Sequence, residues 1–475
     1  MSASDSSTQL RLPALARVRR ALVVGCGQSG VAAAELLAAA GVELRLYDRR
    51  AEVHGLPARL DGAELYFGEA LPPDAAFADL DLLVLSPGVP PRLFRERYRR
   101  LVPEAELHGE LSLALTMVAD WNLPTVLVTG TNGKSTVTAL TGAMLAAGGL
   151  SPFVGGNLGI PLCELVLAVA EGRRERPGAL VLECSSYQLE TLRVYPEAPR
   201  TSVAMLLNVS PDHLDRYDSI GHYAQTKARI FAGLDASSLA LLAANDPFTP
   251  TSSQAVPPVA DSKLVDGPEP PRLTEGSQDL ELRPDERYAR SQLPLAGRHN
   301  AINALFALAG ARHLGVSREH CEAAMAGFHA LPHRMNPIAE RGGVVFYDDS
   351  KATNVASVLA GLDGFERPFV LICGGRAKQG DDLRALREVL GRRAKGLVAI
   401  GESAEQFLAM ARGAVPCQQA VDMHAAVRAA ASMASPGDAV LLSPACASWD
   451  MYRSFAHRGE VFAEAVRALG SPDTD

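Results

Sequence analysis

Short apolar runs alternate with amphipathic stretches along most of the chain, and many of these runs end in glycine, serine or a charged residue. The stretch PTVLVTGTNGKST at residues 124–136 shows the pattern most clearly, with an apolar run, a glycine turn and then helical spacing up to Gly148. This order predicts a strand, a loop and a helix. A similar alternation from Leu331 onward favours a parallel sheet with helices on both faces.

The loop in this stretch has the chemistry of a phosphate-binding turn. Its backbone N–H groups favour an anion, Lys134 supplies a positive charge, and Ser135 and Thr136 offer hydroxyls to a magnesium ion. The spacing departs from the common phosphate-loop pattern, because Gly130 lies only three residues before Gly133. A helix-capping turn with an exposed lysine is the alternative, but the strand before the loop and the helix after it favour nucleotide binding.

A second glycine turn lies near the N-terminus, where ALVVGCGQSG at residues 21–30 has GxGxxG spacing directly after an apolar run. The next helix should extend to about residue 40, and a second strand, VELRLYD, ends at Asp48. This fingerprint fits either NAD or a UDP-type nucleotide. A third strand ends in the turn at residues 86–88, at the edge where open α/β sheets bind ligands.

Polar residues follow the predicted strands of the middle region. Glu183 ends a buried strand, where a carboxylate either coordinates magnesium or caps the next turn. His213 follows another strand, and a single histidine is more often a structural residue than a ligand. Lys227 has the pattern of an ordinary solvated helix lysine. Residues 249–288 are rich in Pro, Ser, Asp and Glu, which predicts a surface excursion with only short strand-like pieces.

Composition excludes several classes of protein. The chain has 475 residues, of which 47% are hydrophobic, so it is long enough for about three domains. Its net charge of -8 provides no basic field for nucleic acid. The seven cysteines form no CxxC pair, which argues against both a disulfide framework and a zinc site.

The sequence gives no sign of a membrane protein. The apolar stretch after Arg20 resembles a secretory signal, but glycines, Gln28, Ser29 and Glu35 interrupt it, so a strand, a turn and a helix explain it better. No other run approaches the ~20 apolar residues that span a bilayer. We expect a cytoplasmic protein whose polar residues 1–15 are disordered.

Eight motifs occur in a fixed order: TGTNGKST, GGNLG, LECSSYQLE, NVSPDHLDRY, GRHNAINA, LPHR, DSKATN and LLSPACASWD. With these motifs, the chain resembles the Mur ligases of peptidoglycan synthesis from about residue 20 to residue 466. The resemblance implies an α/β fold with three domains. These are a Rossmann-like UDP-sugar domain at residues 1–107, a P-loop-type ATPase domain at 108–330, and a Rossmann-like glutamate domain at 331–475. It also favours UDP over NAD at the first glycine turn.

The motifs LPHR, DSKATN and SPACAS point to one reaction within this family. The resemblance implies ATP-dependent addition of D-glutamate to UDP-N-acetylmuramoyl-L-alanine through an acyl phosphate. We therefore expect three small-molecule substrates, two magnesium ions, and a monomer that binds neither nucleic acid nor membrane.

The resemblance also assigns residues to sites. The ATP site would comprise Gly130, Thr131, Asn132, Gly133, Lys134, Ser135, Thr136, Asn303, Arg334, Asp349 and Lys351. The UDP-sugar would contact Gln28, Ser29, Asp48, Arg49, Gly88 and Asn157. Glutamate would contact Thr353, Lys378, Ser448 and Phe455. The catalytic residues would be Lys134, Glu183, His213 and Lys227, and the metal ligands Ser135, Glu183, His213 and Lys227 as a carbamate.

Two residues near the expected glutamate pocket depart from the family's usual pattern, namely Arg376 and Trp449. Arg376 is either a solvated loop charge or an additional contact to a carboxylate. Because these residues bear on the shape of the pocket, L-glutamate stays an alternative substrate.

Three other functions compete with this one. A folylpolyglutamate synthase-like enzyme also adds glutamate, but it lacks the separate N-terminal glycine-turn domain. An NAD-dependent oxidoreductase would have no use for the phosphate loop, Glu183 or His213. A non-catalytic nucleotide-binding regulator would be favoured if Glu183 or His213 were replaced, and both are present.

Overall fold

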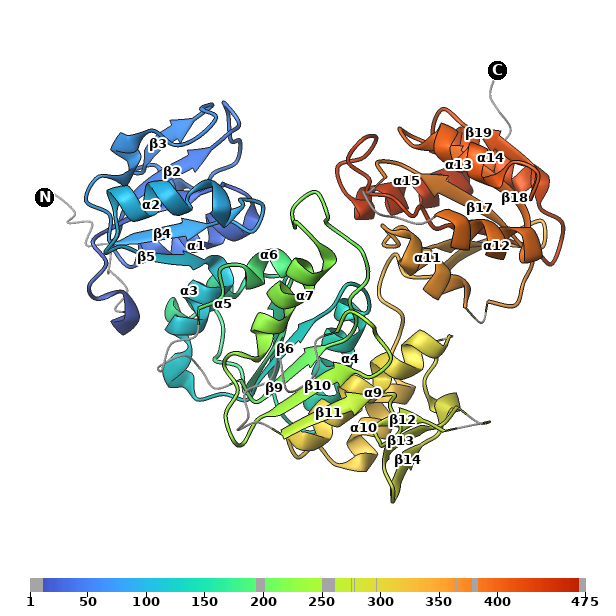
Figure 1. Cartoon of the computed structure of the whole chain (residues 1–475), viewed down its shortest axis with the longest axis horizontal. Helices are drawn as coiled ribbons and strands as arrows, with labels where there is room; N and C mark the ends of the chain where they lie inside the picture. Colours follow the sequence, from blue (N-terminus) through green and yellow to red (C-terminus); the bar gives the residue numbers. More distant parts are fainter. Residues whose placement is uncertain are drawn as a thin grey trace, which may run out of the picture.

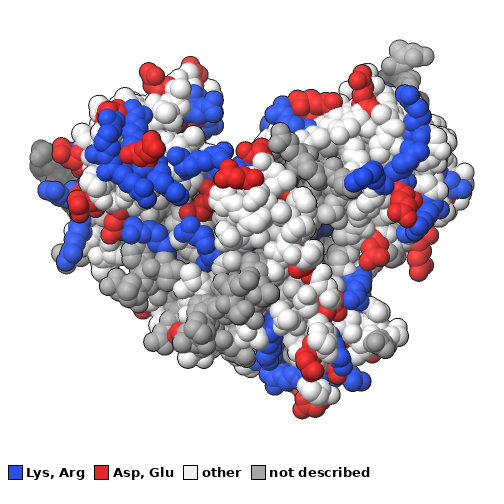
Figure 2. All heavy atoms as spheres, in the orientation of Figure 1, with Lys and Arg blue, Asp and Glu red and all other residues white. Residues whose placement is uncertain are grey.

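The computed structural model describes residues 12–193, 201–249, 261–274, 276, 278–295, 297–363, 365–377 and 383–469. Figure 1 shows three bodies that follow one another along the chain, each built around a sheet of mostly parallel strands. This confirms the predicted α/β fold. Figure 2 shows a wide notch between the first and third bodies, with Lys and Arg side chains gathered over the first body and interspersed with acidic ones.

The first body contains a parallel sheet in the order β3-β2-β1-β4-β5. Its strands are β1 (Arg20–Val24), β2 (Glu43–Asp48), β3 (Glu64–Phe67), β4 (Leu82–Leu85) and β5 (Glu106–Gly109), and its helices are α1 (Gln28–Ala39), α2 (Arg95–Leu101) and α3 (Glu110–Met117). The strand expected to be third is therefore the fourth. Sequence reasoning missed β3 because this edge strand is half-exposed and lacks a continuous apolar run.

The glycines of the first turn are required by close packing. Gly25 has φ 94°, and a Cβ at Gly30 would lie 1.9 Å from the Gly25 carbonyl oxygen. Only glycine lets α1 begin this close to the end of β1. The pattern after residue 20 thus forms the predicted strand, turn and helix.

The central body contains a parallel sheet in the order β11-β10-β9-β6-β8-β7. Its strands are β6 (Thr125–Thr129), β7 (Pro152–Gly156), β8 (Ala179–Glu183), β9 (Val203–Leu206), β10 (Leu239–Ala243) and β11 (Asp261–Val265). Its helices are α4 (Lys134–Ala147), α5 (Leu162–Ala170), α6 (Ser186–Leu189), α7 (Ile220–Ala228), α9 (Arg298–His313) and α10 (Arg318–Ala326). The predicted strand, phosphate loop and helix are β6, the loop and α4, as expected.

The surface excursion expected at residues 249–288 is only partly correct. Residues 250–260 lie outside the described part of the chain, but β11 extends the central parallel sheet. A small antiparallel sheet follows, with strands β12 (Arg272–Leu273), β13 (Leu280–Arg283) and β14 (Glu286–Tyr288). The polar composition gave no sign of the edge strand β11, whereas β13 is one of the short strand-like pieces that the sequence predicts.

The third body contains a sheet in the order β15-β16-β20-β17-β18-β19, parallel except for the β15–β16 hairpin. Its strands are β15 (Asn336–Arg341), β16 (Val344–Asp348), β17 (Phe369–Gly374), β18 (Ala394–Ile400), β19 (Cys417–Gln419) and β20 (Ala439–Leu442). Its helices are α11 (Val355–Leu362), α12 (Leu383–Arg393), α13 (Ala404–Ala411), α14 (Met423–Met433) and α15 (Phe455–Ala468). The hairpin was not expected.

Seven short 3-10 helices complete the described elements: Pro13–Leu15, Ala58–Leu60, Asp74–Phe77, Pro91–Leu93, Ala119–Trp121, Arg229–Phe231 and Arg290–Gln292. The first of them corrects the expectation that residues 1–15 are disordered, because Leu15 is buried against the first core. Residues 1–11 lie outside the described part of the chain. None of the helices in the described residues is long and apolar enough to cross a membrane.

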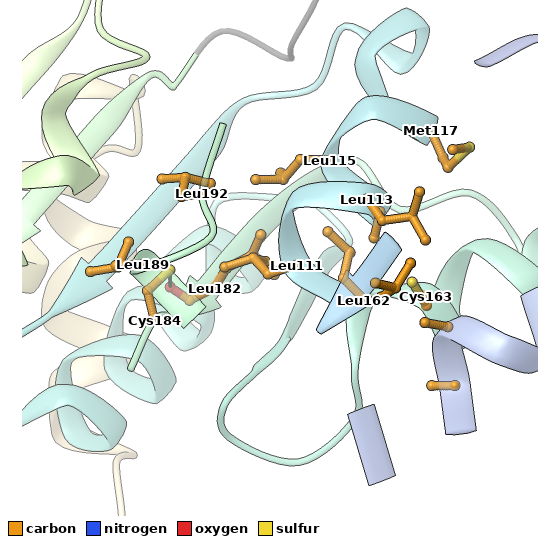
Figure 3. Close-up of a cluster of buried hydrophobic side chains, with 14 of the residues drawn as sticks. Leu111, Leu113, Leu115, Met117, Leu162, Cys163, Leu182, Cys184, Leu189 and Leu192 are labelled. Carbon is orange, nitrogen blue, oxygen red and sulfur yellow. Dashed lines mark hydrogen bonds between the residues drawn. The ribbon is translucent and has the colours of Figure 1, made fainter. Parts of the chain in front are cut away.

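The two domain junctions differ in chemistry. One apolar cluster runs from the first body into the central one, joining α3, α5 and β8 through Leu111, Leu162 and Leu182 (Figure 3). The buried apolar clusters of the third body contain only residues of that body, among those described. The third body therefore meets the central one through the polar contacts given below. The domain limits expected at residues 107 and 330 stay a prediction, although β5 pairs in the first sheet as far as Gly109.

Candidate active site

The phosphate loop joins β6 to α4, and its neighbours hold its shape. Gly133 has φ 83°, and a Cβ there would lie 2.5 Å from Asn303 Oδ1, so only glycine fits. The Asn132 N–H donates to Asn208 Oδ1 at 2.9 Å, and Asn208 Nδ2 donates to the Asn132 carbonyl at 3.0 Å. These contacts fix the shape of the loop.

Two lysine amines converge on the carbonyl oxygen of Gly130. Lys134 Nζ donates to this oxygen at 2.9 Å and to the Thr131 carbonyl at 2.8 Å. Lys227 Nζ, from the last turn of α7, donates to the same oxygen at 2.8 Å. Because two amines within reach of one atom repel each other when both are charged, the charged form of the more buried amine is disfavoured.

Lys227 is the more buried of the two, with an exposed fraction of 1%. Its amine lies 4.5 Å from the centre of the Tyr223 ring. Burial and, secondly, repulsion from Lys134 lower the pKa of Lys227 well below its usual value. The interpretation of Lys227 as a solvated helix lysine is therefore wrong, and the neutral amine is the nucleophilic form of this side chain.

Glu183 ends β8 beside the phosphate loop and is 2% exposed. Asn157 Nδ2 donates to its Oε1 at 2.6 Å, and the Asn157 N–H donates to the Glu183 carbonyl at 2.9 Å. The other carboxylate oxygen, Oε2, is buried and has no hydrogen-bond partner among the described residues. A buried carboxylate oxygen without a partner is costly unless a cation binds it, so this oxygen fits a magnesium ligand.

His213 is held in a left-handed conformation with φ 55°. Its N–H donates to Asp212 Oδ1 at 2.9 Å, and its Nδ1 lies 2.7 Å from the Tyr187 hydroxyl. With Nδ1–H donating to Tyr187, Nε2 would carry the lone pair that a metal requires. No three His, Cys, Asp or Glu side chains form a complete metal site within the described residues.

The third body contributes charged groups to the same place. Arg334 Nη2 donates to Ser135 Oγ at 3.1 Å, across the junction between the bodies. Asp349 accepts from Ser443 Oγ at 2.6 Å and from the Met335 N–H at 3.2 Å. Burial raises the pKa of Asp349 to about 7, because these contacts do not replace its lost hydration.

A polar latch, made of Asn132, Asp212, Asn354 and Ser357, ties the start of α11 to the phosphate loop. Ser357 Oγ lies 2.7 Å from Asn132 Oδ1 and 2.8 Å from Asn354 Oδ1, to either of which it donates. Asn354 Nδ2 donates to Asp212 Oδ2 at 3.4 Å, beside His213. The latch therefore connects the start of α11 with the phosphate loop and with Asp212, the residue before the predicted metal ligand His213.

We expect Ser357→Ala to raise the KM for ATP about 2- to 10-fold, because one neutral hydrogen bond contributes ~0.5 to 1.5 kcal/mol. The measurement is the ATP dependence of phosphate release. Ser432→Ala is the matched control, since Ser432 is exposed on α14 and donates to the Ala429 carbonyl of its own helix. An unchanged KM in Ser357→Ala would mean that the latch is absent from the nucleotide-bound enzyme.

A pocket lies where the phosphate loop, α9 and the third body meet. Its lining includes Asn132, Gly133, Thr136, His299, Asn300, Asn303, Arg334, Asp349 and Ser357. Asn303 Nδ2 donates to Asn300 Oδ1 at 3.4 Å, so the two asparagines of α9 lie together as their spacing predicts. The structure thus brings most of the predicted ATP residues around one pocket.

The structure describes three of the predicted glutamate residues. Thr353 lies in the loop after β16, Ser448 lies in the loop after β20, and Phe455 begins α15. Lys351 Nζ is 3.6 Å from the centre of the Phe455 ring, Ser448 is buried and Thr353 is half-buried. Lys378 lies outside the described residues.

The two departures from the family pattern, Arg376 and Trp449, point to solvent. Arg376 donates to both carboxylate oxygens of Glu402, at 3.0 and 2.8 Å, with both side chains more than half exposed. This arrangement favours the solvated loop charge. Trp449 is 67% exposed.

Three models of one family match the chain in order. They are the Mur ligase MurD-like N-terminal domain at residues 19–95, the Mur ligase middle domain at 128–311, and the Mur ligase glutamate ligase domain at 333–446. A protein of Aromatoleum aromaticum, named UDP-N-acetylmuramoylalanine--D-glutamate ligase, is 41% identical over 472 residues, which cover 95% of this chain and 97% of the relative. The chain belongs to the Mur ligase family.

Other similar proteins agree with this placement. A protein of the same name from Anaeromyxobacter dehalogenans is 42% identical over 470 residues, covering 93% of this chain and 96% of the relative. The solved pseudomurein peptide ligase type C from Methanothermus fervidus covers 95% of this chain and 100% of its own, with a TM-score of 0.58 and 17% identity. This structural likeness supports the Mur ligase fold.

In this Mur ligase, the predicted UDP residues of the first body lie around the first glycine turn, whereas Asn157 lies beside Glu183 in the central body. Gln28 and Arg49 are exposed, and Gln28 Nε2 donates to the Gly159 carbonyl of the central body at 3.3 Å. Asp48 accepts from the Cys26 N–H at 2.8 Å and from Arg50, and the Arg50 hydrogen bond lowers the pKa of Asp48 to about 2. The Asp48 carboxylate thus stays ionised and holds the first glycine turn by accepting the Cys26 N–H. Whether it also contacts UDP stays a prediction.

Sequence reasoning missed Arg216, which follows His213 in the same motif. Its guanidinium donates to the carbonyls of Pro87 and Gly88 at 3.2 Å and pairs with Glu190 at 2.8 Å. It therefore fixes the turn at residues 86–88 of the first body to the central body. An arginine beside a predicted metal ligand was the available signal, but the carbonyls of Pro87 and Gly88 that it contacts are 129 and 128 positions away in the sequence.

Proposed function

We propose that this Mur ligase uses ATP to join the alanyl carboxylate of UDP-N-acetylmuramoyl-L-alanine to the amine of D-glutamate. The observation that carries the choice of substrate is the likeness, over 95% of the chain, to a protein named for this reaction. The phosphate loop, the orphaned oxygen of Glu183 and the paired lysines support the ATP-dependent chemistry.

The residues of the chain would act mainly by positioning and by charge. Lys134 and Arg334 would contact the phosphates of ATP, and Ser135, Glu183 and His213 would hold two magnesium ions. When bound, these ions supply positive charge that stabilises phosphoryl transfer to the carboxylate. The glutamate amine then displaces phosphate from the acyl phosphate, and the residues of the third body would orient that amine.

Lys227 would be carbamylated. Its neutral amine would attack carbon dioxide, forming an N–C bond and releasing one proton to solvent. The product carries a negative charge next to Lys134, which removes the repulsion between the two amines. Low pKa, burial and the nearby cation all support this modification. The carbamate would complete the metal ligands together with His213.

The other expected features belong to the same proposal. The first body would bind the UDP-sugar through Gln28, Ser29, Asp48, Arg49, Gly88 and Asn157. Thr353, Lys378, Ser448 and Phe455 would bind glutamate. We further propose that the enzyme acts as a cytoplasmic monomer.

Phosphate release from ATP tests the proposal directly. We expect release only when UDP-N-acetylmuramoyl-L-alanine is present, and continuous turnover only when D-glutamate is added. The matched arm replaces D-glutamate with L-glutamate at the same concentration. Release that ignores both substrates would refute the ligase, whereas preference for L-glutamate would change only the identity of the amino acid.

A further inference from the structure

The largest fully buried side chain among the described residues is an arginine of the third body. Arg458, in the first turn of α15, has an exposed fraction of 0%. Burial lowers the pKa of Arg458 to about 10, so it remains a cation at neutral pH. No carboxylate oxygen of the described residues lies within 4.0 Å of its nitrogens. A buried cation without an ion-pair partner is rare and needs a reason.

Neutral oxygens take the place of an ion pair. Arg458 Nε donates to Ser350 Oγ at 3.0 Å, Nη2 donates to the Ser350 carbonyl at 2.9 Å, and Nη1 donates to the Cys446 carbonyl at 3.1 Å. Ser350 Oγ in turn donates to the Phe455 carbonyl at 2.8 Å. The guanidinium therefore joins three segments, which are the loop after β16, the loop after β20 and the first turn of α15.

The neighbouring residue shows how tightly these segments are packed. A Cβ at Gly459 would lie 2.2 Å from His333 Nδ1 and 2.6 Å from Asp348 Oδ2. The His333–Asp348 pair, 2.7 Å apart, directly precedes Arg334 on one side and Asp349 on the other. Arg458 and Gly459 together set the distance between α15 and the loops that reach the nucleotide pocket.

Residues expected to hold glutamate occur in all three of these segments. Thr353 lies in the loop after β16, Ser448 in the loop after β20, and Phe455 begins α15, where its ring contacts Lys351. Arg458 contacts each segment within a few residues of these positions. An unpaired cation here also adds positive potential near the place where a dianionic amino acid would bind.

We propose that Arg458 is a positioning residue for the incoming amino acid, because its guanidinium holds the Ser350 loop, the Cys446 loop and the start of α15 in one arrangement. The proposal rests on the assignment of glutamate to the third body. It separates two halves of the reaction. Acyl phosphate formation needs the phosphate loop, the first body and the contact of Arg334 with the nucleotide pocket, whereas capture of glutamate also needs the three segments that Arg458 joins.

The test compares Arg458→Met and Arg458→Lys with wild type. Arg458→Met should raise the KM for D-glutamate about 10-fold or more, since charge-assisted hydrogen bonds are lost, while the KM for ATP stays within about twofold. Arg458→Lys keeps the positive charge but loses the planar guanidinium with its several N–H donors. Its KM for D-glutamate should therefore lie between those of wild type and Arg458→Met. Hydroxylamine traps the acyl phosphate as a hydroxamate, and this glutamate-independent rate should stay close to that of wild type in both variants.

Ser350→Ala keeps the test decisive if Arg458→Met does not fold. This substitution removes the hydroxyl that accepts from Arg458 and donates to the Phe455 carbonyl, and it adds no volume. It should therefore also raise the KM for D-glutamate. Arg467→Met is the matched control, because Arg467 is exposed on the same helix. A KM for D-glutamate that is unchanged in Ser350→Ala and Arg458→Lys, or an equal loss of hydroxamate formation, would overturn the inference. Absence of glutamate-dependent turnover in wild type would instead refute the proposed function.

Discussion

Lys227→Ala is expected to reduce ATP-dependent ligation to below about 1% of the wild-type rate, because the proposed carbamate, which would complete the metal site, is lost. The amine lies within 2.8 Å of the Gly130 carbonyl and is almost completely buried, so the truncation leaves a cavity beside the phosphate loop. A small carboxylate such as acetate is small enough for such a cavity and carries the same charge as the proposed carbamate. Partial recovery of phosphate release with added acetate is therefore the expected second result.

The structure also defines a competing explanation for that loss. The unmodified amine donates to the Gly130 carbonyl, so its removal could loosen the loop rather than remove a metal ligand. Methylammonium separates the two explanations, because it restores a donor but no negative charge. Rescue by acetate and not by methylammonium supports the carbamate, rescue by methylammonium alone supports the loop contact, and full activity without any additive would remove Lys227 from the mechanism.

Glu183→Gln is expected to lower turnover by about 100- to 1,000-fold with little change in the stability of the ligand-free enzyme. Glutamine keeps the shape of the side chain and the contact of Asn157 with Oε1, but it removes the charge of the orphaned oxygen. Because Oε2 has no hydrogen-bond partner among the described residues, removing its charge breaks no hydrogen bond, and the fold should lose little stability. What is lost is the attraction for a divalent cation.

Thermal unfolding with and without magnesium and ATP measures this difference. In wild type, ligands that bind only the folded state raise the midpoint of unfolding. In Glu183→Gln this increase should shrink while the ligand-free midpoint stays the same. Glu164→Gln, at an exposed position on α5, is the matched control and should behave as wild type. A normal increase together with normal turnover would exclude Glu183 as a magnesium ligand.

The contrast between the two domain junctions bears on how the reaction is organised. A continuous apolar core joins the first two bodies, and breaking it would expose leucines from α3, α5 and β8 to water. The third body contacts the phosphate loop through a few hydrogen bonds, including those of Arg334 and Ser357. Hydrogen bonds exchange with water at little net cost, so this junction is the one suited to open for glutamate and ATP.

The sequence by itself determined the local features of this protein. The strand, glycine loop and helix at residues 124–136 and the turn at residues 21–30 were predicted correctly, because periodicity and glycine spacing are properties of adjacent residues. Edge strands such as β3 and β11 were missed, since their burial depends on a neighbouring strand and leaves only a weak local pattern. The roles of individual site residues came from motif resemblance.

Only the tertiary structure determines which polar groups are buried and so lose their hydration. Nothing near Lys227 in the sequence distinguishes it from a solvated lysine, yet its partner, Gly130, lies 97 positions away. Ser357 meets Asn132 across 225 positions, and Arg458 meets Ser350 across 108. Burial and pairing of these groups arise from contacts between distant segments, which local sequence patterns do not encode, and those contacts set the pKa values and orphaned oxygens on which the chemistry depends.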